Sequence, residues 1–597
     1  MKLMKNYFNK KEKLTAYKWH GFRLMMSVVV LIFAAINPQI CNACTSFLVT
    51  KKASADGSTM ITYAADSHVR YGELYWKPAA SWAEGTMVTL YDRGTAKPLG
   101  QVPQVPHTYQ VVGFMNEHQV SIGESTFGGR NELVDTTGIV DYGSLMFLAL
   151  QRSKTAREAI KVIAELVEEY GYASSGESFS IGDPNEVWIM EIIGKGTELK
   201  TDRKTKTQYN ANKGAVWVAI RIPDGYISAH ANQARITNFP IEDNSRSISS
   251  KNLDKIFNPD IEIVYAHDVI SFAKSKEYYE GDDANFSFCD AYAPIDFEAL
   301  RFCELRVWAV FNRLSDGMEP YLDFAKGDVN AARIPLYIKP NRKITPQDLM
   351  ECKRDYLQGT EFDMSQDAGA GPFGLPYRWR PLTWKQDDKT YFHERVTATQ
   401  QTGFSFIAQM RDWLPAPIGG IFWFSVDDTG STVYVPFYCG ITSVPHTYAE
   451  GNGDMLTYSD NAAFWVFNRV AHFAYLFYDR VMVDVRELQG QLETKFAQYT
   501  PAVDAAALKL YETNPDLARA FLTDYSSSSA NETIYKWKEL GEFLLVKYLD
   551  GNVKHEESGK FLRNQWGFPR SPQFPGYSND WKRILIEETG NKFEVPE

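Results

Sequence analysis

The chain has 597 residues, of which 44% are hydrophobic, 23% are charged and 14% are aromatic. These values are typical of a folded globular protein and exclude a disordered chain or a coiled coil. The length requires at least two packed units, or one large catalytic domain with a substantial addition. The formal net charge of −11 disfavours nucleic-acid binding, because phosphate recognition needs clustered positive charge.

A secretory signal peptide is predicted for residues 1–43. Residues 1–26 carry seven lysines and arginines against one acid, and the uncharged apolar run 27–36 follows. About ten apolar residues are too few to span a bilayer, which takes about twenty, and no later stretch is long enough, so no membrane span is expected. Removing residues 1–43 would leave 56 basic and 73 acidic side chains, a formal charge of −17.

Cys41 and Cys44 form a C-x-x-C pattern at the end of the predicted signal. A thioredoxin-type redox pair would open a helix, whereas the strand-like segment 45–53 follows Cys44. A structural zinc site would need a second Cys/His pair at ligand spacing, and the sequence supplies none. Neither a redox pair nor a zinc site is therefore favoured.

Two further interpretations concern the processing of the chain at Cys44. A cysteine directly after a signal peptide is where bacterial lipoproteins are modified, but the preceding residues here do not follow the usual aliphatic and small pattern. Ordinary cleavage after Ala43 is the alternative, because "CNA" places small residues at the positions that signal peptidase reads. Cys44 would then open the mature chain, unless it is a chance cysteine at the junction.

An amino-terminal cysteine combines a thiol and a free α-amine in one residue. A thiol attacks an amide carbonyl as the thiolate, and an α-amine with a pKa of about 8 is suited to take its proton. An acylated amine could not act as this base, so the nucleophile and lipoprotein hypotheses largely exclude each other. The mature chain would hold an odd number of cysteines, which leaves one thiol unpaired: Cys44, Cys289, Cys303, Cys352 and Cys439.

Short apolar runs predict strands in the first part of the chain. Residues 44–52 and 58–66 flank the turn sequence "ASADG" and predict a hairpin. Two helices are expected at residues 141–153 and 155–171, the second with a Thr155–Glu158 capping box and Gly171 at its end. Strands with helices packed on them predict a layered α+β fold. Further strands are expected at residues 109–116, 119–126, 178–183, 186–193, 215–222 and 225–232.

The later part of the chain becomes more helical. A helix is expected at residues 345–362, and strands follow at residues 420–428 and 431–438. A long amphipathic helix is predicted over residues 459–498, with its aromatic side chains in the core. The chain after residue 500 is predicted to be mostly helical, with a loop at the four serines 526–529.

Six segments follow one another between residue 44 and about residue 500: "CTSFLVTKKASADGSTMITYAADSH", "GFMNEHQVSIGEST", "IGDPNEVWIMEI", "WVAIRIPDGYISAHANQARI", "LRVW" and "WFSVDDTGSTVYVPFYCGI". Together they resemble the dipeptidase A family of N-terminal-nucleophile cysteine hydrolases. The resemblance implies an α+β fold of the four-layer αββα type, with two antiparallel sheets between helical layers and a helical C-terminal extension. It divides the chain into a signal peptide 1–43, a peptidase domain 44–500 and a helical region 501–597.

The resemblance also implies hydrolysis of dipeptides, and no cofactor or metal ion is expected. Cys44 is similar to the nucleophile of the family, and its α-amine to the base. Asp66 in "YAADSH" resembles the carboxylate that holds and charges this amine. Asn232 in "AHANQ" resembles the residue whose side-chain amide stabilises the tetrahedral oxyanion. An arginine near "RFCELRVW" should complete the site, and Arg301 and Arg306 both qualify.

Some of these positions allow other interpretations. Tyr63 departs from the family pattern, in which an arginine often stands three residues before the carboxylate, so stabilisation of the thiolate is left open. Asp66 could be a turn acid and Asn232 an Asx-turn residue. Residues 124–126 are candidates to line the cleft. His230 lies near the motifs, but an N-terminal amine removes the need for a histidine base.

The sequence thus predicts a secreted or periplasmic cysteine dipeptidase that binds small peptide substrates and no nucleic acid. A homo-oligomer is compatible with the sequence. Two other functions stay open. One is an acylase or amidase of the same superfamily that cleaves bile-salt or penicillin-type amides, and the other is a lipid-anchored surface protein without enzymatic activity.

Overall fold

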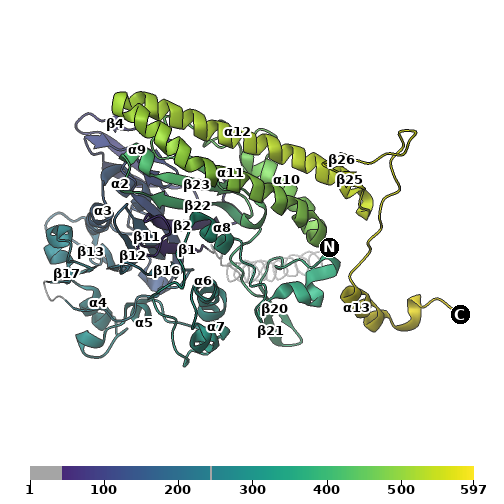
Figure 1. Cartoon of the computed structure of the whole chain (residues 1–597). Coiled ribbons are helices and arrows are strands. Elements are labelled where there is room, and N and C mark those ends of the chain that lie inside the picture. The colour runs from purple at the N-terminus through teal and green to yellow at the C-terminus, as the bar shows by residue number, and fades with distance from the viewer. Residues whose placement is uncertain (1–43, 242–244, 597) are drawn as a thin grey trace, which may run out of the picture. The chain divides into compact units, whose positions relative to one another are not determined.

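Within the described residues the fold is built on two large sheets (Figure 1). The computed structural model describes residues 44–241 and 245–596, so the predicted signal peptide lies outside the described part. The first sheet is antiparallel throughout, and its strands in spatial order are β19 (Tyr337–Ile338), β16 (Ile227–His230), β1 (Ser46–Val49), β2 (Thr59–Asp66), β22 (Thr402–Met410), β23 (Ile421–Val426) and β24 (Val435–Tyr438).

The second sheet has nine strands, of which only β17 and β18 pair in parallel. Its strands in spatial order are β17 (Ser247–Ser249), β18 (Ile263–Tyr265), β15 (Ala215–Arg221), β12 (Val187–Gly194), β11 (Gly176–Gly182), β10 (Ser121–Gly128), β9 (Met115–Asn116), β8 (Val111–Val112) and β3 (Trp76–Lys77). The predicted α+β class is confirmed.

The predicted hairpin at the start of the chain is confirmed by the pairing of β1 with β2. Leu48 pairs with Ile61, and Val49 pairs with Met60. Every residue of both strands is buried, because the apolar side chains of this hairpin face the core on both sides of the sheet. The hairpin therefore holds Cys44 and Asp66, which lie at its two open ends, in the interior of the molecule.

The two sheets pack face to face, with β1 and β2 against β10 and β11. Gly123 in β10 permits a close approach, because a Cβ atom there would lie 3.1 Å from Cβ of Tyr63 and 3.2 Å from the carbonyl oxygen of Thr62. A larger residue would push the sheets apart at this point. The next residue of β10, Glu124, is thus held close to the strand that ends in Asp66.

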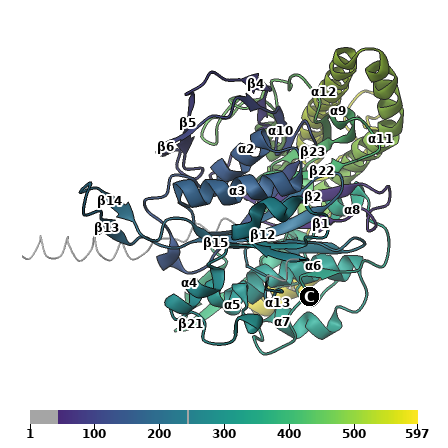
Figure 2. The same cartoon turned by 90° about the vertical axis from the view of Figure 1, so that its left-hand side faces the viewer.

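Two helices cover the other face of the nine-stranded sheet (Figure 2). They are α2 (Tyr142–Arg152), which contacts β10, and α3 (Ala156–Tyr170), which contacts β11, β12 and β15. The Thr155 hydroxyl accepts a hydrogen bond from the Glu158 N–H at 3.2 Å, and Gly171, with φ of 73°, ends α3. Glu158 accepts from the Lys154 N–H instead of closing the predicted capping box.

A further group of helices packs on the seven-stranded sheet. They are α8 (Pro346–Lys353) against β2 and β22, α10 (Ala463–Leu476) against β23, and α11 (Tyr478–Thr513) and α12 (Pro515–Lys547) against β24. Figure 1 shows α11 and α12 lying side by side as a long pair. The expected helical character of the last part of the chain is confirmed through α12.

Two details of the predicted C-terminal helices are wrong. The single helix expected over residues 459–498 breaks at Phe477, whose φ of −148° and ψ of 57° are not helical, and so becomes α10 and α11. The four serines expected as a loop lie inside α12. Ser526 and Ser529 are buried, and the Ser526 hydroxyl accepts a hydrogen bond from the Tyr438 N–H at 3.4 Å. Small side chains here let the helix approach β24 closely.

Two buried ion pairs tie α11 to the sheet part of the molecule. Arg354 pairs with Glu493, and Arg411, which directly follows β22, pairs with Asp504. Both arginine side chains are almost fully buried, at 3% and 4% exposure. Helix α11 runs through residue 500, the boundary expected between the peptidase domain and the helical region, without a break.

The remaining elements are short. The helices are α4 (Val269–Ser275), α5 (Phe288–Tyr292), α6 (Leu305–Leu314), α7 (Leu322–Lys326), α9 (Ala416–Gly419) and α13 (Asn579–Thr589). The strands form pairs of β4 (Ala80–Ser81) with β7 (His107–Thr108), β5 (Met87–Tyr91) with β6 (Pro98–Pro103), β13 (Leu199–Thr201) with β14 (Gln208–Asn210), β20 (Thr383–Gln386) with β21 (Lys389–Phe392), and β25 (Glu556–Glu557) with β26 (Lys560–Phe561). Among the described residues, no helix combines the length and apolar character needed to cross a membrane.

Candidate active site

Cys44 lies just before β1, and its side chain is 4% exposed. Its thiol donates a long hydrogen bond to Oε1 of Glu124 at 3.7 Å, and the hydroxyl of Tyr63 lies 3.9 Å from Sγ. The Tyr63 hydroxyl donates to the same Glu124 oxygen. The thiol therefore sits in a polar corner that is formed by the facing strands β2 and β10.

Asp66 ends β2, and its carboxylate is fully buried. Oδ2 pairs with the guanidinium of Arg395 at 2.6 Å, and Oδ1 accepts from the Thr402 hydroxyl at 2.7 Å. Burial raises the pKa of Asp66, while the charge of Arg395 and the hydrogen bond from Thr402 oppose this rise. The arginine and the threonine thus stabilise a carboxylate that would otherwise be costly to bury.

Strand pairing explains why Asn232 lies near Cys44. Ser46 pairs with His230 in the antiparallel β1–β16 pair, so the same register continued outward sets Cys44 opposite Asn232. Asn232 has φ of 63°, a left-handed conformation that asparagine tolerates better than most residues. Its Nδ2 donates to the Thr126 carbonyl at 2.7 Å.

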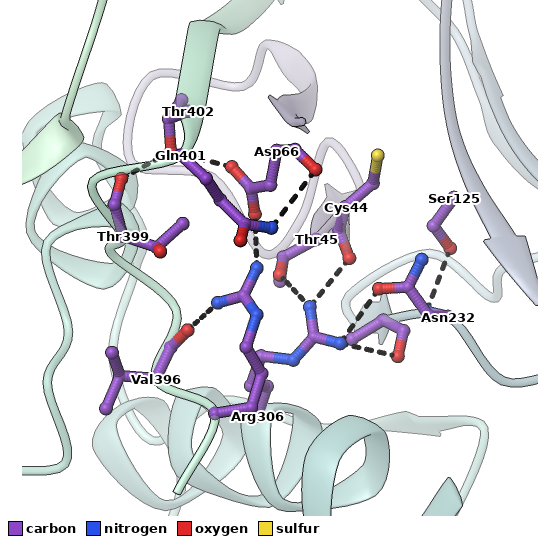
Figure 3. A network of polar contacts seen from close by, with 12 residues as sticks. Cys44, Thr45, Asp66, Ser125, Asn232, Arg306, Val396, Thr399, Gln401 and Thr402 are labelled. Carbon is purple, nitrogen blue, oxygen red and sulfur yellow. Dashed lines mark hydrogen bonds and ion pairs between the residues drawn. The ribbon is translucent and has the colours of Figure 1, made fainter. Parts of the chain in front are cut away.

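Arg306 on α6 is hydrogen-bonded both to the segment that begins at Cys44 and to Asn232 (Figure 3). One guanidinium nitrogen donates to the Cys44 carbonyl oxygen at 2.7 Å and to the Thr45 hydroxyl at 2.6 Å. The other donates to Oδ1 of Asn232 at 2.8 Å and to the Ala231 carbonyl at 3.1 Å. The side chain is 1% exposed. A single buried guanidinium thus fixes the backbone of Cys44 and the amide orientation of Asn232.

Arg301, the other arginine expected from the sequence, does not reach this cluster. It lies in the π-helical turn Ala299–Glu304 that precedes α6. Its Nε donates to the carboxylate of Glu394 at 2.9 Å, and its guanidinium lies 4.6 Å from the centre of the Phe362 ring. The structure therefore brings Cys44, Asp66, Asn232 and Arg306 together and places Arg301 in a separate ion pair.

Lys353, at the end of α8, is a fully buried lysine beside the cluster. Its ammonium donates to the Thr45 carbonyl oxygen and lies 4.7 Å from the centre of the Phe47 ring. Burial lowers the pKa of Lys353 to about 7, although the negative charges of Asp66 and Cys44 act in the opposite direction. Lys353 thus supports the same short backbone segment that Arg306 holds.

The electrostatic surroundings keep the Cys44 thiol protonated in the full-length chain. Burial raises its pKa well above the ordinary value, and the carboxylates of Glu124 and Asp66 raise it further. A hydrogen bond from the Asp66 backbone acts in the opposite direction. A thiol in this environment needs a local base, or the arrival of positive charge, before it can act as a nucleophile.

His230 has a structural role between the two sheets. Nδ1 lies 2.6 Å from the Ser125 hydroxyl and Nε2 lies 2.7 Å from the Ser180 hydroxyl, so both ring nitrogens are engaged. Burial lowers the pKa of His230 to about 3. The ring is therefore neutral at physiological pH and is held away from base catalysis, as expected from the sequence.

We expect the free energy of unfolding to fall as the pH drops from 6.5 towards 3, because the unfolded chain binds a proton at His230 that the folded chain rejects. Above pH 6.5 this contribution to stability is fully present. Urea unfolding at pH 7.5 and pH 4.5 should show a smaller difference for His230→Gln than for the wild type, while the exposed His107→Gln serves as the matched control. Equal pH differences for His230→Gln and the wild type would contradict the assignment.

Other thiols and potential ligands lie outside this cluster. Cys289, Cys352 and Cys439 are buried thiols, and burial raises the pKa values of Cys352 and Cys439 to about 12, which makes them poor nucleophiles. In residues 44–241 and 245–596, no group of three or more His, Cys, Asp or Glu side chains is placed to hold a metal ion.

Several residues of the cluster could not be singled out from the sequence. Arg395 lies 329 residues after Asp66 in a loop with no motif, and Lys353 stands on a helix in which no sequence pattern indicates a contact with the nucleophile segment. The sequence indicates Glu124 only as a residue that could line the cleft. The alternation along β10 gave a weak indication, because it sets Glu124 on the same face as apolar core residues.

Comparison with known proteins places the chain among the peptide hydrolases. The model of peptidase family C69 matches residues 43–87 and 78–491, which is most of the chain. The chain therefore belongs to peptidase family C69. This match and the relatives below confirm the resemblance to the dipeptidase A family.

Curated relatives are similar over much of their length at low identity. A probable dipeptidase of Latilactobacillus sakei is 23% identical over 68% of this chain and 76% of its own. A probable dipeptidase of Salmonella dublin is 24% identical over 67% of this chain and 81% of its own. Probable dipeptidase B of Lactococcus lactis is 23% identical over 83% of this chain and 94% of its own.

Proposed function

We propose that this peptidase is an exported cysteine dipeptidase whose nucleophile is the Cys44 thiol and whose base is the Cys44 α-amine, freed by removal of residues 1–43. The observation that carries the proposal is the convergence of Cys44, Thr45 and Asn232 on the buried guanidinium of Arg306. The names of the curated relatives support dipeptides as the substrate class.

The catalytic cycle follows from the chemistry of these groups. The α-amine takes the thiol proton, and the thiolate attacks the scissile carbonyl. The Asn232 side-chain amide donates to the oxyanion, because Arg306 and the Thr126 carbonyl fix the amide in one orientation. The protonated amine then gives its proton to the leaving amine, and water hydrolyses the thioester. Asp66 is the carboxylate that favours the charged form of the amine.

The arrangement of the fold supports the N-terminal-nucleophile class. Two facing sheets carry α2 and α3 on one side and α8, α10, α11 and α12 on the other, which fits a four-layer αββα sandwich. In that fold the nucleophile opens a strand of one sheet, as Cys44 precedes β1. Because Arg306 holds the carbonyl of Cys44, processing of the preceding peptide bond would leave this anchor in place.

Two measurements test the proposal together. Mass spectrometry of the exported protein should find a chain that begins with an unmodified Cys44, and this chain should hydrolyse members of a dipeptide panel. A diacylglyceryl group on Cys44 would contradict the proposed base. Cleavage of bile-salt or penicillin-type amides, with all dipeptides left intact, would instead favour an acylase of the same superfamily.

A further inference from the structure

Glu124 and Glu177 form a buried carboxyl pair beside the nucleophile. Their side chains lie on the neighbouring strands β10 and β11, and they are 1% and 0% exposed. Oε2 of Glu124 and Oε1 of Glu177 accept no hydrogen bond from any other group of the described residues, and the two carboxyl groups are hydrogen-bonded to each other. Burial and the adjacent Glu124 raise the pKa of Glu177 well above its ordinary value.

This pair lacks the arginine that compensates some other buried acids of the chain. Within the described part of the chain, no ion pair reaches Glu124 or Glu177, and the Tyr63 hydroxyl is a neutral partner. A buried carboxylate without a cation is costly, so the arrangement points to a cation that arrives from outside. Three other buried acids have an arginine: Asp66 with Arg395, Glu304 with Arg235, and Glu493 with Arg354.

Arg93 is an arginine whose charge acts on this region, but it is not the missing cationic partner of Glu124. Arg93 affects the pKa of Tyr63, but its guanidinium lies 5.4 Å from the centre of the Phe114 ring and 5.3 Å from that of Phe147. It thus lies beside two aromatic rings, which stack on each other, rather than in an ion pair with the Glu124 carboxyl group. Arg93 therefore does not compensate this carboxyl group.

The distance to Cys44 identifies where such a cation would be. In a dipeptide the α-nitrogen lies about 2.5 Å from the scissile carbonyl carbon, as bond lengths and the backbone angle require. That carbon must come within about 3–3.5 Å of Sγ before attack. A free α-ammonium is therefore never more than about 6 Å from Sγ, and Oε1 of Glu124 is 3.7 Å from the same atom.

We propose that Glu124 is the receptor for the α-ammonium group of the substrate, so that the site selects peptides with a free amino terminus. This inference rests on the proposed function and specifies its substrate. Tyr63 acts as a positioning residue, because its hydroxyl fixes one oxygen of Glu124. Bound ammonium would also cancel the charge that disfavours the Cys44 thiolate, which couples substrate binding to activation.

The test compares two substrates that differ only in the α-ammonium. A dipeptide Ala-Xaa, with Xaa chosen from the panel, is paired with isobutyryl-Xaa, in which a methyl group replaces the ammonium. The wild type should favour the dipeptide by about 100-fold or more in kcat/KM, because a site built for a polar group rejects an analogue without it. In Glu124→Gln this preference should fall to about fivefold or less, mainly through loss of the dipeptide rate.

Two controls separate recognition of the ammonium group by Glu124 from a general effect of losing a glutamate and from a role of Glu124 as a base. Glu186→Gln, a glutamate that pairs with Arg157 away from the cluster, should keep the wild-type preference. Alkylation of Cys44 by iodoacetamide should be as fast in Glu124→Gln as in the wild type, or faster, since a negative charge has been removed. Slower alkylation would make Glu124 a base and overturn the receptor role.

The outcomes also distinguish this inference from the proposed function. If the wild type cleaves the dipeptide and its isobutyryl analogue equally well, the receptor role fails while the dipeptidase assignment stands. If the wild type cleaves the isobutyryl compound but no dipeptide, the proposed function itself fails. The wild-type comparison can overturn the receptor role even if Glu124→Gln does not fold.

Discussion

Replacing Cys44 with alanine is expected to abolish dipeptide hydrolysis, with a loss of kcat/KM of about 10⁴-fold or more. Cys289, Cys352 and Cys439 are buried with raised pKa values, which makes them poor nucleophiles, and the partly exposed Cys303 lies in the π-helical turn that precedes α6. The measurement is the initial rate on the best dipeptide of the panel, with enzyme concentration high enough to detect slow turnover.

The fold should survive this change. Alanine removes a sulfur whose contacts to Tyr63 and Glu124 are 3.9 Å and 3.7 Å long, so the cost in unfolding free energy should be about 1 kcal/mol. Thermal unfolding checks this, and mass spectrometry checks that the variant is still cleaved before residue 44. Substantial hydrolysis by a folded, correctly cleaved alanine variant would refute the nucleophile assignment.

Replacing Arg306 with lysine should lower kcat/KM by about 10³-fold, although the positive charge is kept. The guanidinium donates from two nitrogens to Cys44, Thr45 and Asn232 at once, and a single ammonium cannot span these acceptors. The Asn232 amide would lose its fixed orientation, and with it the alignment of its N–H towards the oxyanion. The loss should appear mainly in kcat.

Arg301→Lys is the matched control for this variant. Arg301 precedes α6 and pairs with Glu394, so its replacement should change kcat/KM by about threefold or less. Alkylation of Cys44 by iodoacetamide should remain possible in both variants, because neither removes the thiol. An Arg306→Lys enzyme as active as Arg301→Lys would show that the guanidinium does not organise the site.

The strands near the amino terminus could be predicted because their apolar pattern is short, continuous and bounded by turn residues. The hairpin of β1 and β2 and the helix cap at Thr155 follow from local chemistry. The serines at residues 526–529 misled the prediction, since serine favours loops when it is exposed. In α12 their small size serves contact with β24, a tertiary reason that local sequence does not contain.

Some residues of the candidate site could likewise be predicted from the sequence, and others could not. Cys44, Asp66 and Asn232 stand in recognisable segments, and the β1–β16 register then sets Cys44 opposite Asn232. Arg395 and Lys353 act from positions hundreds of residues away, so no local pattern could assign them to Asp66 or to Thr45. The choice between Arg301 and Arg306 needed the helix orientation, because the two residues are only five positions apart.

The ion pair between Arg411 and Asp504 connects helix α11 to strand β22, which lies next to β2. Arg411 directly follows β22, and β22 pairs along its whole length with β2, the strand that ends in Asp66. A chain ended at residue 500 would lack the carboxylate that pairs with this arginine. Shortening the protein at its far end would therefore strain the alignment of the strand that carries the carboxylate beside Cys44.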